Sequence, residues 1–213
     1  GYKILGIEQF GITHEFGSHA GQSRIIRRAY FEHPDYVPLL YRAYENWREL
    51  ERETGEKIYF RTGLLYAGNP DHEIIKGVEN SAGLYNIGLE QLNSVAANDR
   101  FPQFRFPEDF DILFEPDAGF VTPEKAIRLY AEQAIRNGAA IHVNEKTTGW
   151  KRDGDGIMVE TDRSIYRCDK LVITTGAWSG KMIPGYSSRI KVTRQFVAWI
   201  KTKKENGFAL NHF

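Results

Sequence analysis

The chain of 213 residues has little of several features that would point to a particular compartment or partner. Its single cysteine, Cys168, excludes an internal disulfide framework and fits a reducing compartment such as the cytoplasm. No run approaches the ~18 apolar residues of a membrane span, so we expect no membrane partner. Basic and acidic residues both number 28, and the formal charge of zero gives no general attraction to nucleic acid. The six histidines have no metal-ligand spacing, so we expect no metal.

A further absence concerns the start of the chain. Residues 2–8 predict a short buried strand that ends in Glu8, and dinucleotide-binding folds hold a ribose hydroxyl with an acid at the end of a parallel strand. In such folds a Gly-x-Gly-x-x-Gly turn precedes the acid by about 20 residues, whereas this sequence begins at Gly1. We therefore expect a piece of a longer protein. Glu8 is a candidate ribose ligand, and the alternative is an ordinary surface carboxylate after an edge strand.

Residues 17–30 combine glycines, hydrogen-bonding side chains and arginines. The groups in question are Gly17, Gly21, Ser18, His19, Gln22, Ser23, Arg24, Arg27 and Arg28. Glycine lets the backbone approach a ligand closely, and the planar guanidinium fork binds an anion with both charge and direction. The segment therefore suits a phosphate, a carboxylate or both. The alternative is a set of solvated surface arginines, and for Arg28 we prefer that interpretation.

The remaining pattern predicts helices and strands in alternation. Apolar spacing predicts helices over residues 36–54, 72–82 and 122–137, and strands over residues 57–68, 139–143, 157–161 and 166–174. Gly55 is placed to end the first helix, and Thr62-Gly63 breaks the first strand into a bent pair. Residues 153–156 predict a hairpin turn.

Taken together, these residues resemble the monomeric sarcosine oxidase and N-methyltryptophan oxidase family of flavoenzymes, through nearly the whole chain. The resemblance is carried by Ile7-Glu8, residues 17–30, Tyr36-Val37-Pro38-Leu39, residues 47–55, Arg61-Thr62-Gly63, residues 114–119 and residues 169–178. The order and spacing of so many blocks make it specific. By the family pattern, the first glycine-rich turn and roughly the carboxyl-terminal half are missing.

The resemblance implies a mixed α/β fold, in which part of a Rossmann-like FAD-binding domain has an inserted substrate domain with a mixed sheet. On this pattern residues 1–56 and 120–187 belong to the FAD-binding domain. Residues 57–119 and 188–213 belong to the substrate domain. We expect a cytoplasmic protein that is a monomer at full length.

The resemblance also implies which residues contact FAD. They are Glu8, Ser18, His19, Ser23, Arg24, Thr147, Gly176, Ala177 and Trp178. Thr147 resembles a position that touches the adenosine half through its main chain, and Gly176 would allow close approach of backbone to cofactor. The alternative at Gly176 is a glycine that only eases a turn. Where the family commonly has a second histidine after Gly-Ser, this chain has Ala20, so one imidazole beside the flavin is missing.

Arg24 and Arg27 are the catalytic candidates. A substrate amino acid presents a carboxylate, which a guanidinium binds in a two-pronged manner. In the family, the residue matching Arg27 binds that carboxylate and the residue matching Arg24 lies against the flavin ring. If residues 23–31 form a strand, the two side chains face opposite sides, and if they form a helical turn, they share one. The isoleucines between them favour a strand.

The implied reaction is oxidation of the C–N bond of a secondary-amine amino acid to an imine, with oxygen as the electron acceptor. Two alternatives stay open. One is an FAD-dependent dehydrogenase or cyclic imino acid oxidase of the same superfamily, and the other is a catalytically silent module that binds an anionic partner. We expect the isolated piece to bind FAD weakly and to be inactive.

Overall fold

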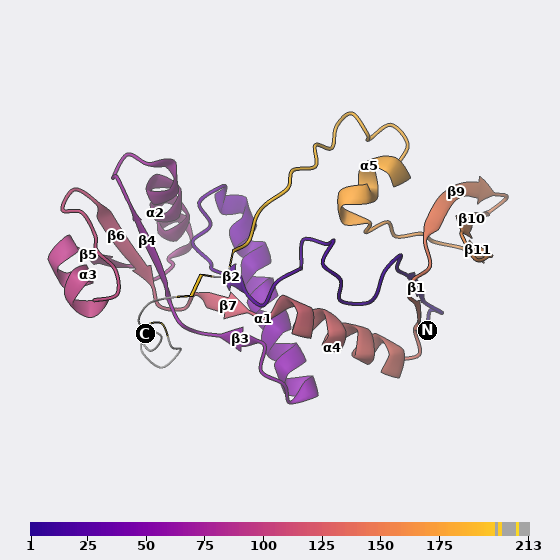
Figure 1. Ribbon diagram of the computed structural model, residues 1–213, viewed down its shortest axis with the longest axis horizontal. Helices are drawn as coiled ribbons and strands as arrows, with labels where there is room; N and C mark the ends of the chain where they lie inside the picture. Colours follow the sequence, from indigo (N-terminus) through magenta and orange to yellow (C-terminus); the bar gives the residue numbers. More distant parts are fainter. Residues whose placement is uncertain (199, 202–207, 209–213) are drawn as a thin grey trace. The chain divides into compact units, whose positions relative to one another are not determined.

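The computed structural model describes residues 1–198, 200–201 and 208. The fold is mixed α/β, as predicted, with one parallel strand pair and several antiparallel sheets (Figure 1). It divides into two compact units: residues 1–22 with 123–198, and residues 23–122 with the described residues after 198. Residues 23–56 thus pack in the second unit, whereas the sequence-based division placed them with the FAD-binding domain. The functional division stays a prediction.

The parallel pair lies in the first unit. Strand β1 (Leu5–Ile7) pairs with β8 (Ala140–His142), which follows helix α4 (Pro123–Arg136) in the chain. The helix and the strand after it confirm the prediction. The expectation of a buried strand over residues 2–8 is wrong in its extent and burial, since Tyr2 is 86 % exposed. Among the described residues, β1 has only β8 as a sheet neighbour, so its other edge has no strand partner there.

The first unit also contains an antiparallel sheet of β9 (Thr147–Asp153), β10 (Gly156–Thr161) and β11 (Ile165–Cys168). Gly154, at φ 62°, makes the turn of the predicted hairpin. The predicted strand over residues 166–174 is wrong beyond Cys168, and Val172 is 81 % exposed. The described residues provide no strand there to pair with it. The 3₁₀ turn η2 (Gly176–Trp178) and helix α5 (Ser179–Met182) follow.

The second unit begins with β2 (Arg24–Ile26), which confirms the strand interpretation for these three residues, whereas residues 27–31 are not in a strand. After the 3₁₀ turn η1 (Pro34–Tyr36), helix α1 (Val37–Thr54) buries Val37, Tyr44 and Leu50. Gly55 ends this helix with φ 72°, as predicted, since glycine adopts the left-handed conformation without strain.

The described residues of this unit form two three-stranded sheets, and both are antiparallel. One has the order β2-β7-β3, with β7 (Gly119–Val121) and β3 (Tyr59–Phe60), and the other has β4 (Leu64–Gly68), β6 (Asp111–Glu115) and β5 (Glu90–Leu92) in the order β4-β6-β5. The break between β3 and β4 at Gly63, with φ 74°, confirms the bent pair. Helix α2 (Glu73–Tyr85) was predicted, whereas α3 (Ser94–Arg100) and β5 were not.

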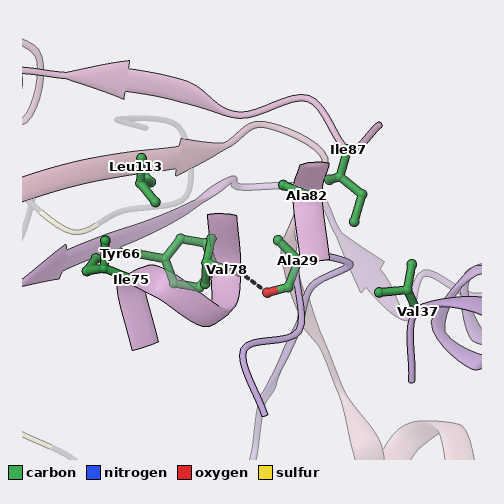
Figure 2. Packing of buried hydrophobic residues seen from close by; sticks show 8 residues of the cluster. All are labelled: Ala29, Val37, Tyr66, Ile75, Val78, Ala82, Ile87 and Leu113. Atoms are coloured by element: carbon green, nitrogen blue, oxygen red, sulfur yellow. Dashed lines mark hydrogen bonds between the residues drawn. The ribbon is translucent and has the colours of Figure 1, made fainter. Parts of the chain in front are cut away.

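The main core of the second unit lies between α2 and the sheet that contains β4 and β6 (Figure 2). Its buried members are Ala29, Val37, Tyr66, Ile75, Val78, Ala82, Ile87 and Leu113. Ala29 belongs to the arginine-containing segment that follows β2, so this segment is anchored in the core rather than lying as a free loop.

Candidate functional site

Glu8 lies directly after β1, and its backbone is held on both sides by the loop after β8. Its N–H donates to the carbonyl of His142 at 2.8 Å, and its carbonyl accepts from the N–H of Glu145 at 3.0 Å. One carboxylate oxygen, Oε1, accepts from the Phe10 N–H at 2.9 Å and lies 3.7 Å from His14 Nε2. The side chain is 38 % exposed, and Oε2 has no hydrogen-bond partner among the described residues. A half-exposed acceptor of this kind suits a hydroxyl donor.

His19 lies in the loop of residues 17–22, with Ser18 exposed beside it. Burial, and then the neighbouring His14 ring, lower the pKa of His19, so its imidazole is neutral at neutral pH. Its Nε2 atom is buried and lacks a hydrogen-bond partner in the described part of the chain. Gly17 permits the close packing, because a Cβ there would lie 2.5 Å from His19 Nδ1. An unsatisfied buried nitrogen calls for a partner, and a ligand atom would supply one.

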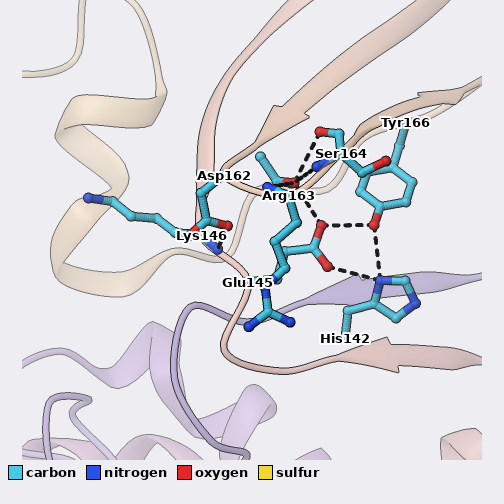
Figure 3. A network of polar contacts seen from close by, with 8 residues as sticks. His142, Glu145, Lys146, Asp162, Arg163, Ser164 and Tyr166 are labelled. Carbon is cyan, nitrogen blue, oxygen red and sulfur yellow. Dashed lines mark hydrogen bonds and ion pairs between the residues drawn. The ribbon is translucent and has the colours of Figure 1, made fainter.

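The loop before Thr147 is fixed by a buried carboxylate that sequence reasoning missed. Glu145 accepts from the Thr161 hydroxyl at 2.7 Å and the Tyr166 hydroxyl at 2.8 Å, and lies 3.1 Å from His142 Nδ1 (Figure 3). The Thr161 hydrogen bond is the largest of the contacts that hold the pKa of Glu145 below its usual value despite burial. An acid just after a strand was the available sequence signal, the same one that indicated Glu8.

The residues after β11 lie near the segment that follows Glu8. The Trp178 ring centroid is 5.8 Å from that of Phe10. Gly176 has φ 49°, so the turn itself favours glycine, and the residue is exposed, with no described atom within 4 Å of the place where a Cβ would lie. Ala177 is exposed between these two residues. The first unit thus brings together the regions of Glu8, His19, Thr147 and Gly176.

The other predicted site residues belong to the second unit. Ser23 is exposed, and its carbonyl accepts from Arg24 Nη1 at 2.8 Å. Arg24 opens β2 opposite Val121 of β7. Arg27 comes one residue after β2 ends, so the sheet fixes the direction in which the chain reaches it.

The Arg27 guanidinium is oriented by aromatic rings. It lies 4.7 Å from the centroid of the Tyr30 ring and 5.5 Å from that of Phe31. Its Nη2 contacts the Glu32 carboxylate at 3.3 Å, and its buried Nε has no hydrogen-bond partner among the described residues. The side chain is 19 % exposed. Arg27 is therefore a preorganised cation that retains donor capacity for a further anion.

Arg28 differs from the prediction. The solvated interpretation is wrong, because its side chain is 15 % exposed and pairs with Asp117 at 3.1 Å. Its guanidinium also lies over the rings of Tyr41 and Tyr44. The sequence alone could not reveal these partners, which come from distant parts of the chain. Arg28 has a packing role in this unit.

Three groups of the first unit have the chemistry needed to contact a dinucleotide cofactor. The free oxygen of Glu8 can accept from a ribose hydroxyl, the orphaned nitrogen of His19 can bond a ligand atom, and the backbone at Gly176 is open. Within the described residues, no three His, Cys, Asp or Glu side chains are grouped to hold a metal ion. No helix among the described residues is long and apolar enough to cross a membrane.

Comparison with known proteins defines the class. The profile of the FAD dependent oxidoreductase family matches residues 1–211, and the chain belongs to this family, whose cofactor is FAD. It is 36 % identical over 203 residues to monomeric sarcosine oxidase of Streptomyces avermitilis, covering 95 % of this chain and 53 % of that protein. It is 35 % identical over 199 residues to N-methyl-L-tryptophan oxidase of Citrobacter koseri, covering 93 % and 53 %. The family resemblance inferred from the sequence is confirmed.

Solved structures agree with this class. NikD, an unusual amino acid oxidase essential for nikkomycin biosynthesis, superposes with a TM-score of 0.78 at 25 % identity over 85 % of this chain and 47 % of its own. Glycine oxidase from Geobacillus kaustophilus shares the fold, with a TM-score of 0.70 at 17 % identity over 84 % of this chain and 50 % of its own. The chain spans about half the length of the curated relatives it matches.

Proposed function

We propose that the full-length protein containing this chain is a flavin-dependent oxidase of a secondary-amine amino acid, of the sarcosine or N-methyl amino acid type. It oxidises the C–N bond to an imine and passes the electrons to oxygen. The names of the relatives at 35 % and 36 % identity support this substrate class. We further propose a cytoplasmic monomer, for which the single cysteine is the supporting observation on compartment.

The observation that supports the proposal most is the orientation of the Arg27 guanidinium and its weak ion pair with Glu32. A guanidinium held over two aromatic rings and poorly paired with Glu32 is ready to bind a carboxylate. Its 3.3 Å contact is longer than a strong charged hydrogen bond, and the Glu32 side chain is 43 % exposed. A partly exposed pair at this distance is worth on the order of 1 kcal/mol, so a substrate carboxylate can replace Glu32 at little cost.

In this proposal the residues of the chain bind and orient the cofactor and the substrate, and this positioning supplies most of the rate enhancement. When bound, FAD would supply the acceptor for the hydride equivalent from the carbon beside the amine. Glu8 accepts a hydrogen bond from the ribose, and His19 offers Nε2 to the cofactor. Thr147 and Gly176 contribute main-chain contacts. The further proposed cofactor contacts are Ser18, Ser23, Arg24, Ala177 and Trp178, with Arg24 also a catalytic candidate beside Arg27.

The test is purification of the full-length protein and measurement of flavin content and oxygen consumption. We expect bound FAD, and oxygen uptake with sarcosine or N-methyltryptophan that exceeds uptake with proline. Turnover that requires an artificial acceptor in place of oxygen would indicate a dehydrogenase, and a preference for proline would indicate a cyclic imino acid oxidase. A purified protein without flavin would indicate the silent anion-binding module.

A further inference from the structure

A buried carboxyl group lies directly beneath the segment that carries Arg27. Glu115, the last residue of β6, is fully buried. One of its oxygens accepts from the backbone N–H of Arg28 at 2.7 Å, and the other accepts from that of Ala29 at 3.3 Å. These are the first two N–H groups after Arg27, so Glu115 fixes the backbone from which the Arg27 side chain extends.

A third donor completes the coordination of this carboxylate. The Tyr66 hydroxyl donates to Glu115 at 2.9 Å. It also lies 3.4 Å from the carbonyl oxygen of Ala29 (Figure 2). Burial, and then the adjacent charge of Glu115, raise the pKa of Tyr66, so the phenol remains protonated and able to donate. Three donors from two different segments therefore meet one carboxylate.

Helix α2 fixes the next two residues of the segment, Tyr30 and Phe31. The Ser81 hydroxyl of α2 donates to the carbonyl of Tyr30 at 2.6 Å. Gly77 of the same helix lies against the backbone of Phe31, since a Cβ there would be 2.2 Å from its carbonyl oxygen. Both aromatic rings that orient the Arg27 guanidinium thus start from fixed backbone positions.

Packing alone does not explain why a charged residue occupies position 115. A buried carboxylate has a large desolvation cost, and apolar residues of similar volume often give equal or greater stability. What the carboxylate provides, and an apolar side chain does not, is a directional link to two consecutive N–H groups. Such a link restricts the backbone torsions that aim the neighbouring side chain.

We propose that Glu115 is a positioning residue for Arg27, holding the backbone of residues 28 and 29 so that the guanidinium meets the substrate carboxylate in two-pronged geometry. The inference rests on the proposed function. It assigns to Tyr66 the supporting role of fixing the carboxylate of Glu115.

The test compares Glu115→Gln and Tyr66→Phe in the full-length, FAD-loaded enzyme. Glu51→Gln is the matched control, because the Glu51 carboxylate also accepts two backbone N–H groups, from Ile58 and Tyr59 at 2.8 Å each, but does not contact the Arg27 segment. We expect the first two variants to raise KM for sarcosine about tenfold, the scale of one charged hydrogen bond, with kcat and FAD content unchanged. Glu51→Gln should lower the melting temperature and leave KM unchanged.

A second readout separates positioning from general damage. N-methylethylamine is a secondary amine without a carboxylate, so its kcat/KM should not depend on the aim of Arg27. We expect Glu115→Gln to reduce the preference for sarcosine over this amine about tenfold. If Glu115→Gln does not fold, the same preference ratio, measured in Tyr66→Phe, tests the inference.

Two outcomes would overturn the inference: an unchanged preference ratio, which includes an equal loss for both amines, or the same rise in KM in Glu51→Gln. A wild-type enzyme that retains FAD but oxidises no N-methyl amino acid would instead refute the proposed function, and the inference would fall with it. The two failures are therefore distinguished by the wild-type measurement.

Discussion

The backbone N–H of Glu145 donates to the carbonyl oxygen of Glu8 at 3.0 Å, which joins the segments that follow β8 and β1. The two acids have different surroundings at this junction. The Glu145 carboxylate is buried and hydrogen-bonded to Thr161 and Tyr166, whereas the Glu8 carboxylate is half-exposed, and its Oε2 has no hydrogen-bond partner in the described part of the chain. Of two acids that each follow a parallel strand, one therefore fixes the loop and the other remains available to a ligand.

Replacing Glu8 by alanine should weaken FAD binding by the full-length protein. Loss of a charged acceptor for a ribose hydroxyl corresponds to about a tenfold to hundredfold rise in the dissociation constant. Titration of the apoprotein with FAD, followed by flavin fluorescence, measures it. Glu15→Ala, at an exposed position of the same segment, is the control and should leave the affinity unchanged. Equal affinities in the Glu8 variant and the wild type would remove Glu8 from the ribose role.

Replacing Arg27 by lysine should weaken substrate binding far more than flavin binding. Lysine keeps the charge but loses the two-pronged fit and the stacking on Tyr30 and Phe31, so we expect the apparent substrate dissociation constant to rise about tenfold or more. Rapid-mixing kinetics of flavin reduction at varied sarcosine concentration measures this. Arg42→Lys, at an exposed helix position, is the control. Loss of bound flavin, or an unaltered substrate affinity, would contradict the assignment.

The sequence predicted the elements whose signals are local. Helix α1 follows from its apolar spacing and Gly55, and the bend between β3 and β4 follows from Gly63. The burial of residues 2–8 and the strand over residues 169–174 were mispredicted, because an apolar segment forms a buried strand only where other elements pair with it and cover it. Helix α3 was missed, although Asn93 caps it by accepting from the Ala96 N–H at 2.8 Å.

The site residues, too, were predictable from the sequence only where their signal is local. Glu8 was recognisable because its position at the end of a strand is a local property of the sequence. Glu115 and Glu145 were not, since an acid is normally exposed and only distant donors make its burial tolerable. Tyr66, which donates to Glu115, is 49 residues away in sequence. Buried hydrogen-bonded acids of this kind require the tertiary structure.

Acid should destabilise the first unit through Glu145. Its pKa in the folded protein lies below the ordinary value of 4.5, so its ionised form adds stability above that value. This contribution is lost as the pH falls below 4.5 and through the lowered pKa of the folded protein. We expect the melting temperature of the full-length protein to fall with acidification, and Glu145→Gln to make that fall shallower. Glu132→Gln, at an exposed position on α4, should retain the wild-type slope, and identical slopes in all three proteins would contradict the assignment.

Two glycines of α2 should respond to alanine with opposite signs. At Gly83 nothing lies within 4 Å of a new Cβ, so Gly83→Ala should stabilise the protein by about 0.5–1 kcal/mol through helix propensity. At Gly77 a Cβ would lie 2.2 Å from the Phe31 carbonyl oxygen, a backbone atom, and the helix would have to move away. We expect Gly77→Ala to cost about 1–3 kcal/mol.

Thermal and denaturant unfolding of the two variants measure these changes. Because Phe31 orients the Arg27 guanidinium, Gly77→Ala should also raise KM for the amino acid substrate, whereas Gly83→Ala should not. A Gly77→Ala protein with wild-type stability would show that α2 does not pack against the Phe31 backbone. Lower stability with an unchanged KM would confirm the packing but separate it from the orientation of Arg27.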